Sequence, residues 1–229
     1  MIYITIMAAP EFDLLIINGC VYDGLGHLGV EVDLAVKRDR IALLSKGIAT
    51  ARAGTVIDAR GMAVAPGFID PHSHTDIELL VNPRAESKIR QGVTTEIAGN
   101  CGYTVFPLTW RNYEERRRYC DEQYGVPLIW RDIGGFFSEL ESRGMAVNYA
   151  TFMGHGTLRG AVFGAQDRPP NSEELAAMKE LIRQNMEMGA LGLSTGLIYV
   201  PGCYADQREL IELCRETAVY GGIYSTHMR

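Results

Sequence analysis

Four histidines and one cysteine of this 229-residue chain stand directly after short apolar runs that are typical of buried strands. In a βα barrel, catalytic groups collect at the carboxyl ends of the strands. Imidazole and thiolate groups are the ligands that zinc prefers, so this clustering predicts a metal site. The runs cover 63–70, 94–99, 147–153 and 222–225, and the side chains that close them are His72, His74, Cys101, His155 and His227.

The pair His72 and His74 carries the strongest local signal. Residues i and i+2 of a strand project from the same face, so both imidazoles can reach one ion. The alternative is that both are ordinary polar residues of a loop. Cys101 follows the second run, where a thiolate could bind one zinc ion or bridge two. Taken alone, Cys101 is equally compatible with a small buried apolar residue.

Short apolar runs alternate with helical patterns after residue 62, which predicts an α/β fold with a parallel sheet. The run 63–70 is continuous and apolar, as expected of a strand buried on both faces. A fifth run covers 190–194, so five strands and four crossovers are expected. The helical patterns cover 84–91, 113–123, 132–143, 171–189 and 206–220.

Residues 12–61 have a different character, with short alternating strands separated by turn residues. This pattern predicts a small antiparallel, β-sandwich-like module over 1–62. The domain that carries the histidines would then cover 63–229.

The composition limits the classes of function. The chain has 22 basic and 28 acidic residues and a net charge of −6, so a nucleic-acid partner is not expected. No apolar run is long enough for a membrane span, and the apolar start at 1–7 lacks the basic residues of a signal peptide. Five scattered cysteines without a CxxC motif favour a reduced, cytoplasmic protein. The 25 glycines suggest tight turns or closely approaching backbones.

Asp-x-His-x-His-x-Asp at 70–76, with a later strand-end histidine, resembles the amidohydrolase superfamily of metal-dependent (β/α)8 enzymes. Gly-Asn-Cys-Gly at 99–102, the segment 192–202 and Tyr-Ser-Thr-His-Met-Arg at 224–229 resemble its D-aminoacylase (N-acyl-D-amino-acid deacylase) branch. The resemblance implies the first five strands of a barrel, preceded by the small β module. Other branches bridge two metals with a carboxylated lysine, but no lysine follows Lys179.

The resemblance also implies roles for individual residues. His72 and His74 would hold a weaker metal position, whereas Cys101 and His227 would hold a tight zinc ion. Tyr199 would donate a hydrogen bond to the scissile carbonyl oxygen as charge develops there; a turn aromatic is the alternative. Candidates for supporting the ligands or contacting substrate, with structural hydrogen bonding as the alternative, are Asp70, Asp76, Glu96 and His155.

The implied reaction is zinc-dependent hydrolysis of N-acyl-D-amino acids, which are small molecules, to a D-amino acid and a carboxylate. Zinc polarises the carbonyl group and lowers the pKa of water from about 15.7 toward 7. The family places a further histidine on strand six and an acidic aspartate on strand eight, so we expect this chain to be an incomplete, inactive fragment. The alternatives are amidohydrolase activity on cyclic amides or isoaspartyl dipeptides, and a non-catalytic degenerate half-barrel.

Overall fold

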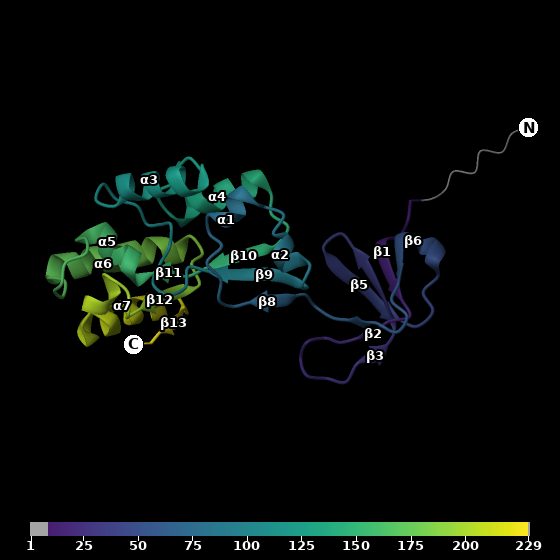
Figure 1. Ribbon diagram of the computed structural model, residues 1–229. Helices are drawn as coiled ribbons and strands as arrows, with labels where there is room; N and C mark the ends of the chain where they lie inside the picture. The colour runs from purple at the N-terminus through teal and green to yellow at the C-terminus, as the bar shows by residue number, and fades with distance from the viewer. Residues whose placement is uncertain (1–8, 229) are drawn as a thin grey trace, which may run out of the picture. The chain divides into compact units, whose positions relative to one another are not determined.

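The computed structural model describes residues 9–228 (Figure 1), and the chain divides into two units between Pro66 and Gly67. Each unit has its own strands and its own buried residues, so the two are described separately.

The first unit contains two sheets. One has the order β5-β4-β1-β6, and the other has the order β3-β2-β7. Phe12, Leu15, Ala35 and Ile48 form its buried core. The elements are β1 (Phe12–Ile17), β2 (Cys20–Val21), β3 (Val30–Glu31), β4 (Asp33–Lys37), β5 (Arg40–Ser45), the 3-10 turn η1 (Thr50–Arg52), β6 (Ala53–Asp58) and β7 (Ala63–Val64).

The prediction of an antiparallel module is right for β1, β4 and β5 but wrong for two other strands. β6 runs parallel to β1, and β7 runs parallel to β2. The chain passes from β5 at one edge of the four-stranded sheet to β6 at the other edge, which allows the parallel direction. Side chains alternate with the same period in both kinds of pairing, so the sequence pattern did not distinguish them.

The second unit is built on parallel strands. β8 (Phe68–Asp70) pairs with β9 (Val93–Ala98), and β9 pairs with β10 (Asn148–Thr151). After Phe152 the chain continues as β11 (Met153–Gly154), which pairs with β12 (Gly192–Gly196), and β12 pairs with β13 (Ile223–His227). All four pairings are parallel, so the carboxyl ends of these strands face the same way.

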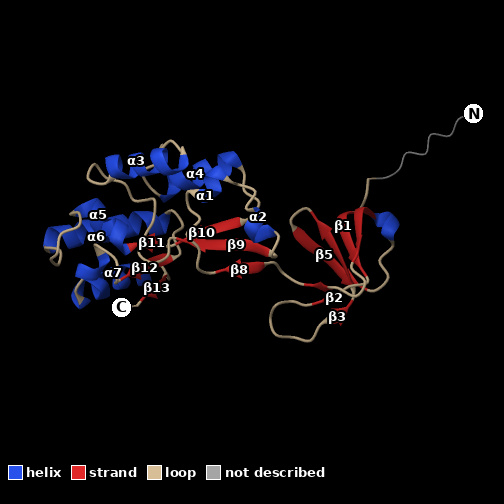
Figure 2. Cartoon of the chain, viewed as in Figure 1, coloured by secondary structure: helices blue, strands red, loops and turns tan. Residues whose placement is uncertain are grey.

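Helices separate these strands along the chain (Figure 2), as the α/β prediction requires. Phe136, Leu158, Met178 and Leu193 are fully buried in the core that the helices share with the strands. None of the helices within residues 9–228 is long and apolar enough to cross a membrane. The elements are α1 (Glu78–Val81), α2 (Glu86–Ile89), α3 (Tyr113–Tyr124), α4 (Ile133–Arg143), α5 (His155–Val162), α6 (Ser172–Glu187), η2 (Gly202–Tyr204) and α7 (Gln207–Val219).

The apolar run 63–70 does not form one strand buried on both faces, so that prediction is wrong. Its first part is β7, which pairs with β2 of the first unit. Pro66 and Gly67 interrupt the run, and β8 pairs with β9 alone among the described strands. Phe68 and Ile69 are therefore 66% and 61% exposed. An apolar run reports hydrophobicity but not how many neighbours its strand has.

Helix α6 begins with a capping box, in agreement with the helix start seen in the sequence. The side chain of Asn171 accepts a hydrogen bond from the amide of Glu174, and the Glu174 carboxylate accepts one from the amide of Asn171, both 2.8 Å long. Arg168 adds two 2.7 Å hydrogen bonds to the same carboxylate. These contacts, the Arg168 hydrogen bonds first, lower the pKa of Glu174 to about 2.

We expect Glu174→Gln to lower the free energy of unfolding by about 1 kcal/mol at pH 7, because the amide keeps the cap but loses the charge that Arg168 binds. The folded-state pKa of about 2 lies below the ordinary value of 4.5. The stabilisation is therefore complete above pH 4.5 and is lost as the pH falls toward 2. Urea denaturation at pH 7 and pH 3 measures the difference between the two proteins. Glu173→Gln is the control, and a difference that does not shrink with pH would contradict this account.

Candidate metal centre

The ligand atoms of His72, His74 and Cys101 all lie within 4.8 Å of one another. The Cys101 sulfur is 3.3 Å from Nε2 of His72 and 3.7 Å from Nδ1 of His227. The two histidines follow β8, Cys101 lies in the turn after β9, and His227 ends β13. The parallel strands thus bring these four side chains to the same edge.

His72 and His74 reach this cluster from a loop and not from a strand. β8 ends at Asp70, so the i, i+2 rule for strands does not apply to them. Their rings nevertheless meet edge to face, with centroids 5.4 Å apart. The two imidazoles lie close together as expected, although His72 and His74 are not on a strand.

The donor set fits a zinc ion. In a tetrahedral site with nitrogen and sulfur ligands, the ligand atoms are roughly 3.3–3.8 Å apart. The distances from the Cys101 sulfur to His72 and His227, 3.3 and 3.7 Å, fall in that range. Burial lowers the pKa of His74, with the neighbouring His72 charge as a second cause, which favours the neutral imidazole that a metal binds. Burial raises the pKa of the Cys101 thiol, and a bound cation would oppose that effect.

The turn that carries Cys101 is fastened to β12. The buried Ser194 hydroxyl donates a 2.5 Å hydrogen bond to the carbonyl of Gly99 and accepts a 3.0 Å one from the amide of Gly102. Cys101 itself has a φ of 55°, in the left-handed region that costs a non-glycine residue energy. The hydrogen bonds on both sides of the cysteine maintain this conformation. Ser194, the last residue of the run 190–194, therefore positions the thiol.

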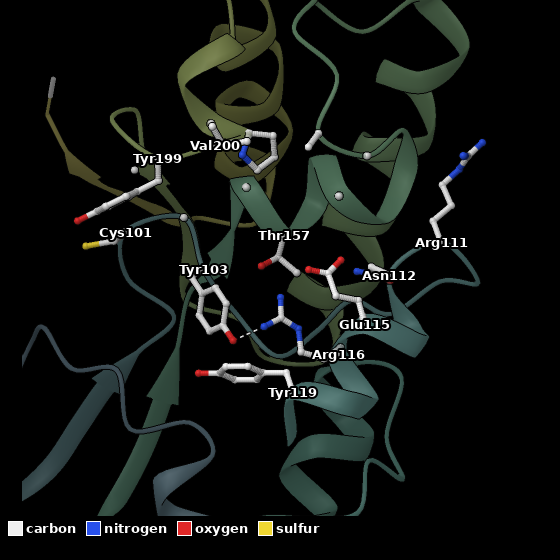
Figure 3. Close-up of a pocket in the computed structure, with 18 of the residues that line it drawn as sticks. Cys101, Tyr103, Arg111, Asn112, Glu115, Arg116, Tyr119, Thr157, Tyr199 and Val200 are labelled. Carbon is white, nitrogen blue, oxygen red and sulfur yellow. Dashed lines mark hydrogen bonds between the residues drawn. The ribbon is translucent and has the colours of Figure 1, made fainter. Parts of the chain in front are cut away.

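Tyr199 lies in the loop after β12, and its ring packs edge to face on the ring of His227, with centroids 5.3 Å apart. Half of its surface is exposed. Tyr199, His74 and Cys101 line a cavity of about 910 Å³ (Figure 3). The phenol is therefore part of the same hollow as the ligand cluster.

Asp70 and Glu96 meet at Lys88. The Lys88 ammonium lies 2.5 Å from Asp70 and 3.2 Å from Glu96, and its hydrogen bond is the main cause that lowers the pKa of Asp70. Asp70 also accepts a 3.1 Å hydrogen bond from the amide of His72, while the buried Glu96 accepts one from Thr75. Both carboxylates thus brace the loop that carries the two histidines.

Asp76 is buried at the end of that loop and accepts a 2.6 Å hydrogen bond from the Tyr149 hydroxyl. Burial raises its pKa to about 6, and the Tyr149 hydrogen bond partly opposes the rise. The three acids that the sequence singled out all lie around the histidine loop, and none of them is in the ligand cluster.

His155 is not brought to the cluster. It is fully buried at the start of α5, with Nε2 2.8 Å from the Glu209 carboxylate. Arg159 pairs with the same carboxylate. This buried group joins α5 to α7. The helix after β11 went unpredicted because Gly154-His155-Gly156-Thr157 has none of the usual helix-start signals.

Sequence reasoning missed one wall of the cavity. Tyr103, Arg116 and Tyr119 line it, and Figure 3 shows the Arg116 guanidinium beside the Tyr103 and Tyr119 rings. Arg116 donates a hydrogen bond to the Tyr103 hydroxyl. The sequence feature that could have indicated this wall is the long segment between β9 and β10, which contains α3.

Known proteins match this architecture. The model of the amidohydrolase family matches residues 55–218. The chain belongs to the amidohydrolase family. This amidohydrolase is 42% identical over 221 residues to the D-aminoacylase of Alcaligenes xylosoxydans xylosoxydans. The aligned residues make up 96% of this chain. The alignment spans 45% of that relative. The resemblance to the D-aminoacylase branch is confirmed.

Solved structures agree with the sequence comparison. A D-aminoacylase studied for its binuclear metal center superposes on this amidohydrolase with a TM-score of 0.84 at 36% identity, covering 95% of this chain and 45% of the other. An N-acyl-D-glutamate deacylase from Bordetella bronchiseptica, complexed with zinc and a phosphonate inhibitor, superposes with a TM-score of 0.86 at 33% identity. It covers 96% of this chain and 45% of the other. The amidohydrolase chain therefore spans about half the length of these relatives.

We expect Gly196→Ala to lower the free energy of unfolding of this amidohydrolase by about 2 kcal/mol. A Cβ at Gly196 would overlap the carbonyl oxygen of Cys101 and lie 2.8 Å from the Tyr199 ring. Urea denaturation measures the loss. Gly160→Ala on α5 is the control, because its Cβ would meet nothing within 4 Å, and it should stabilise the helix by about 0.5–1 kcal/mol. A Gly196→Ala protein as stable as the parent would show that the turn and the β12 loop can separate freely.

Proposed function

We propose that this protein is a zinc-dependent hydrolase that converts N-acyl-D-amino acids to D-amino acids and carboxylates. The observation that carries the proposal is the Cys101 thiol between the imidazoles of His72 and His227, at 3.3 and 3.7 Å. The similarity to D-aminoacylase and to a zinc-bound N-acyl-D-glutamate deacylase supports the same chemistry.

Cys101 and His227 would hold the tight zinc ion, and His72 and His74 would hold a second, weaker position. The Cys101 sulfur lies next to the His72 and His74 pair and also next to His227, which supports a bridging role for Cys101. Bound zinc would polarise the scissile carbonyl group and lower the pKa of water.

Tyr199 would donate a hydrogen bond to the carbonyl oxygen of the substrate amide as negative charge develops there. Its place on the cavity wall and its packing on the His227 ring support this role. Asp70, Asp76 and Glu96 would support the ligands, since their hydrogen bonds fix the histidine loop. His155 would act at a distance, through the packing of α5.

The second unit would be the first five strands of a (β/α)8 barrel, and the first unit would be a β-sandwich-like module that precedes it in the chain. The parallel order of β8 to β13 supports the first assignment. The share of about 45% that the chain covers in its relatives supports an N-terminal portion of a longer enzyme.

Cys101→Ala should weaken zinc binding at least tenfold, because the alanine removes the shared sulfur ligand. Competition with a chromogenic chelator measures zinc affinity. Cobalt substitution adds an independent readout, since a cobalt–thiolate charge-transfer band should be present in the parent and absent in the variant. Cys20→Ala, in the first unit, is the control and should behave like the parent. A cobalt–thiolate band that survives in Cys101→Ala would place the metal elsewhere.

Release of D-amino acids tests the reaction itself. The zinc-loaded product of the complete reading frame that contains these residues should hydrolyse N-acetyl-D-amino acids and leave the L-enantiomers intact. Tyr199→Phe should lower kcat about 10²–10³-fold with zinc content unchanged, because it removes one hydrogen bond to the developing oxyanion. Hydrolysis of imides or isoaspartyl dipeptides without D-amino-acid release would refute the proposed substrate class.

A further inference from the structure

We propose that Arg116, together with the Tyr103 hydroxyl, recognises a carboxylate group of the substrate and so determines which acylated compounds enter the cavity. This inference deepens the proposed function and rests on it for the identity of the substrate. The cavity of about 910 Å³ runs from the ligand cluster to this arginine, and Figure 3 shows Cys101 and Tyr199 on one side of it and Arg116 and Tyr119 on the other. Its volume is typical of a small-molecule site.

The Arg116 side chain is held in place before any ligand binds. It projects from α3 and donates a hydrogen bond to the Tyr103 hydroxyl. Its guanidinium carbon lies 4.5 Å from the centre of the Tyr103 ring and 5.7 Å from that of Tyr119. Cation–π contacts on both rings restrict the planar group to one orientation. A fixed guanidinium loses little conformational entropy when an anion binds.

Arg116 forms no ion pair with any carboxylate of residues 9–228, and its buried Nε has no hydrogen-bond partner there. Arg111 on the same wall also forms no ion pair within residues 9–228, but it has no buried nitrogen without a hydrogen-bond partner. Arg117, the next residue of α3, pairs with Glu114 at 3.0 Å, and the buried Arg159 pairs with Glu209. Placing an arginine in a cavity without a counter-ion is costly, and an incoming anion would remove that cost.

The donors that remain suit a carboxylate. A guanidinium has five N–H groups in a planar fork, and Arg116 uses one of them on Tyr103. The Tyr103 oxygen accepts that hydrogen bond, and its hydroxyl also contacts Tyr119, so its proton would turn from Tyr119 to reach a bound carboxylate. A carboxylate beside both groups would receive hydrogen bonds from Arg116 and from Tyr103.

The remainder of the wall favours an anion with an apolar part. Arg111 also lines the cavity, with its guanidinium 4.4 Å from the centre of the Trp110 ring, whereas Glu115 supplies the one carboxylate among the described lining residues. Two arginines against one glutamate leave this wall positive. The rings of Trp110 and Tyr119 offer apolar contact to an acyl or side chain.

The carboxylate could be the α-carboxylate that every N-acyl amino acid carries or the side-chain carboxylate of an acidic amino acid. Both present the same chemistry to Arg116. Three probes separate them: N-acetyl-D-leucinamide has no carboxylate, N-acetyl-D-leucine has one, and N-acetyl-D-glutamate has two.

Binding to the metal-free protein, measured by isothermal titration calorimetry, tests the proposal without any turnover. The parent should bind at least one of the two carboxylate probes at least tenfold more tightly than N-acetyl-D-leucinamide. Arg116→Gln should abolish this preference, Arg116→Lys should keep part of it, and Arg117→Gln should keep all of it. If Arg116→Gln weakens the binding of both N-acetyl-D-leucine and N-acetyl-D-glutamate, Arg116 binds the α-carboxylate. If it weakens the binding of N-acetyl-D-glutamate alone, Arg116 binds the side-chain carboxylate.

The proposal is overturned if the parent shows no preference for the carboxylate probes, or if correctly folded Arg116→Gln, checked by circular dichroism, retains the parent's preference. These outcomes are independent of the proposed reaction. A protein that binds carboxylates through Arg116 but releases no D-amino acid would refute the proposed function and leave this inference intact. A protein that releases D-amino acids but shows no preference for the carboxylate probes would refute this inference and leave the proposed function intact.

Discussion

The structure of the second unit depends on the close approach of two backbones, the turn after β9 and the end of β12. Ser194 joins them by hydrogen bonds to Gly99 and Gly102. Gly102 and Gly196 permit the contact, since a Cβ on Gly102 would lie 2.8 Å from the Gly196 nitrogen. This contact directs the Cys101 thiol toward His72 and His227. Without these hydrogen bonds, nothing would offset the energetic cost of the left-handed conformation of Cys101.

Charge around the site is arranged in two separate groups. Asp70 and Glu96 share the Lys88 ammonium behind the histidine loop, outside the cluster of imidazole and thiol groups. On the cavity wall, Arg116 has aromatic neighbours and no acid partner within residues 9–228. The first group places two carboxylates on one ammonium, whereas the second leaves a positive charge available. With both proposals, the cavity would combine a metal-binding end with an anion-binding end.

Much of the fold and part of the site could be predicted from local pattern. The start of α6 is a local feature, and the helical pattern predicted over 171–189 begins at the Asn171 of its capping box. The parallel strands were located by their apolar runs, but the run 63–70 was divided between β7 and β8 because strand pairing depends on distant neighbours. Helix α5 escaped prediction because its stability comes from packing, with Leu158 fully buried, and not from its first turn.

By itself, the sequence determined the types of chemistry that are available: imidazoles and a thiol after apolar runs, and the motifs that identify the amidohydrolase family. Only the tertiary structure decided which of them meet. His72, Cys101 and His227 come together, while His155 turns to Glu209, although all four follow predicted strands. Strand order decides which carboxyl ends are adjacent, but the direction of each side chain depends on loop conformation and on contacts more than 100 residues apart in the chain, such as that between Cys101 and His227 (|i−j| = 126).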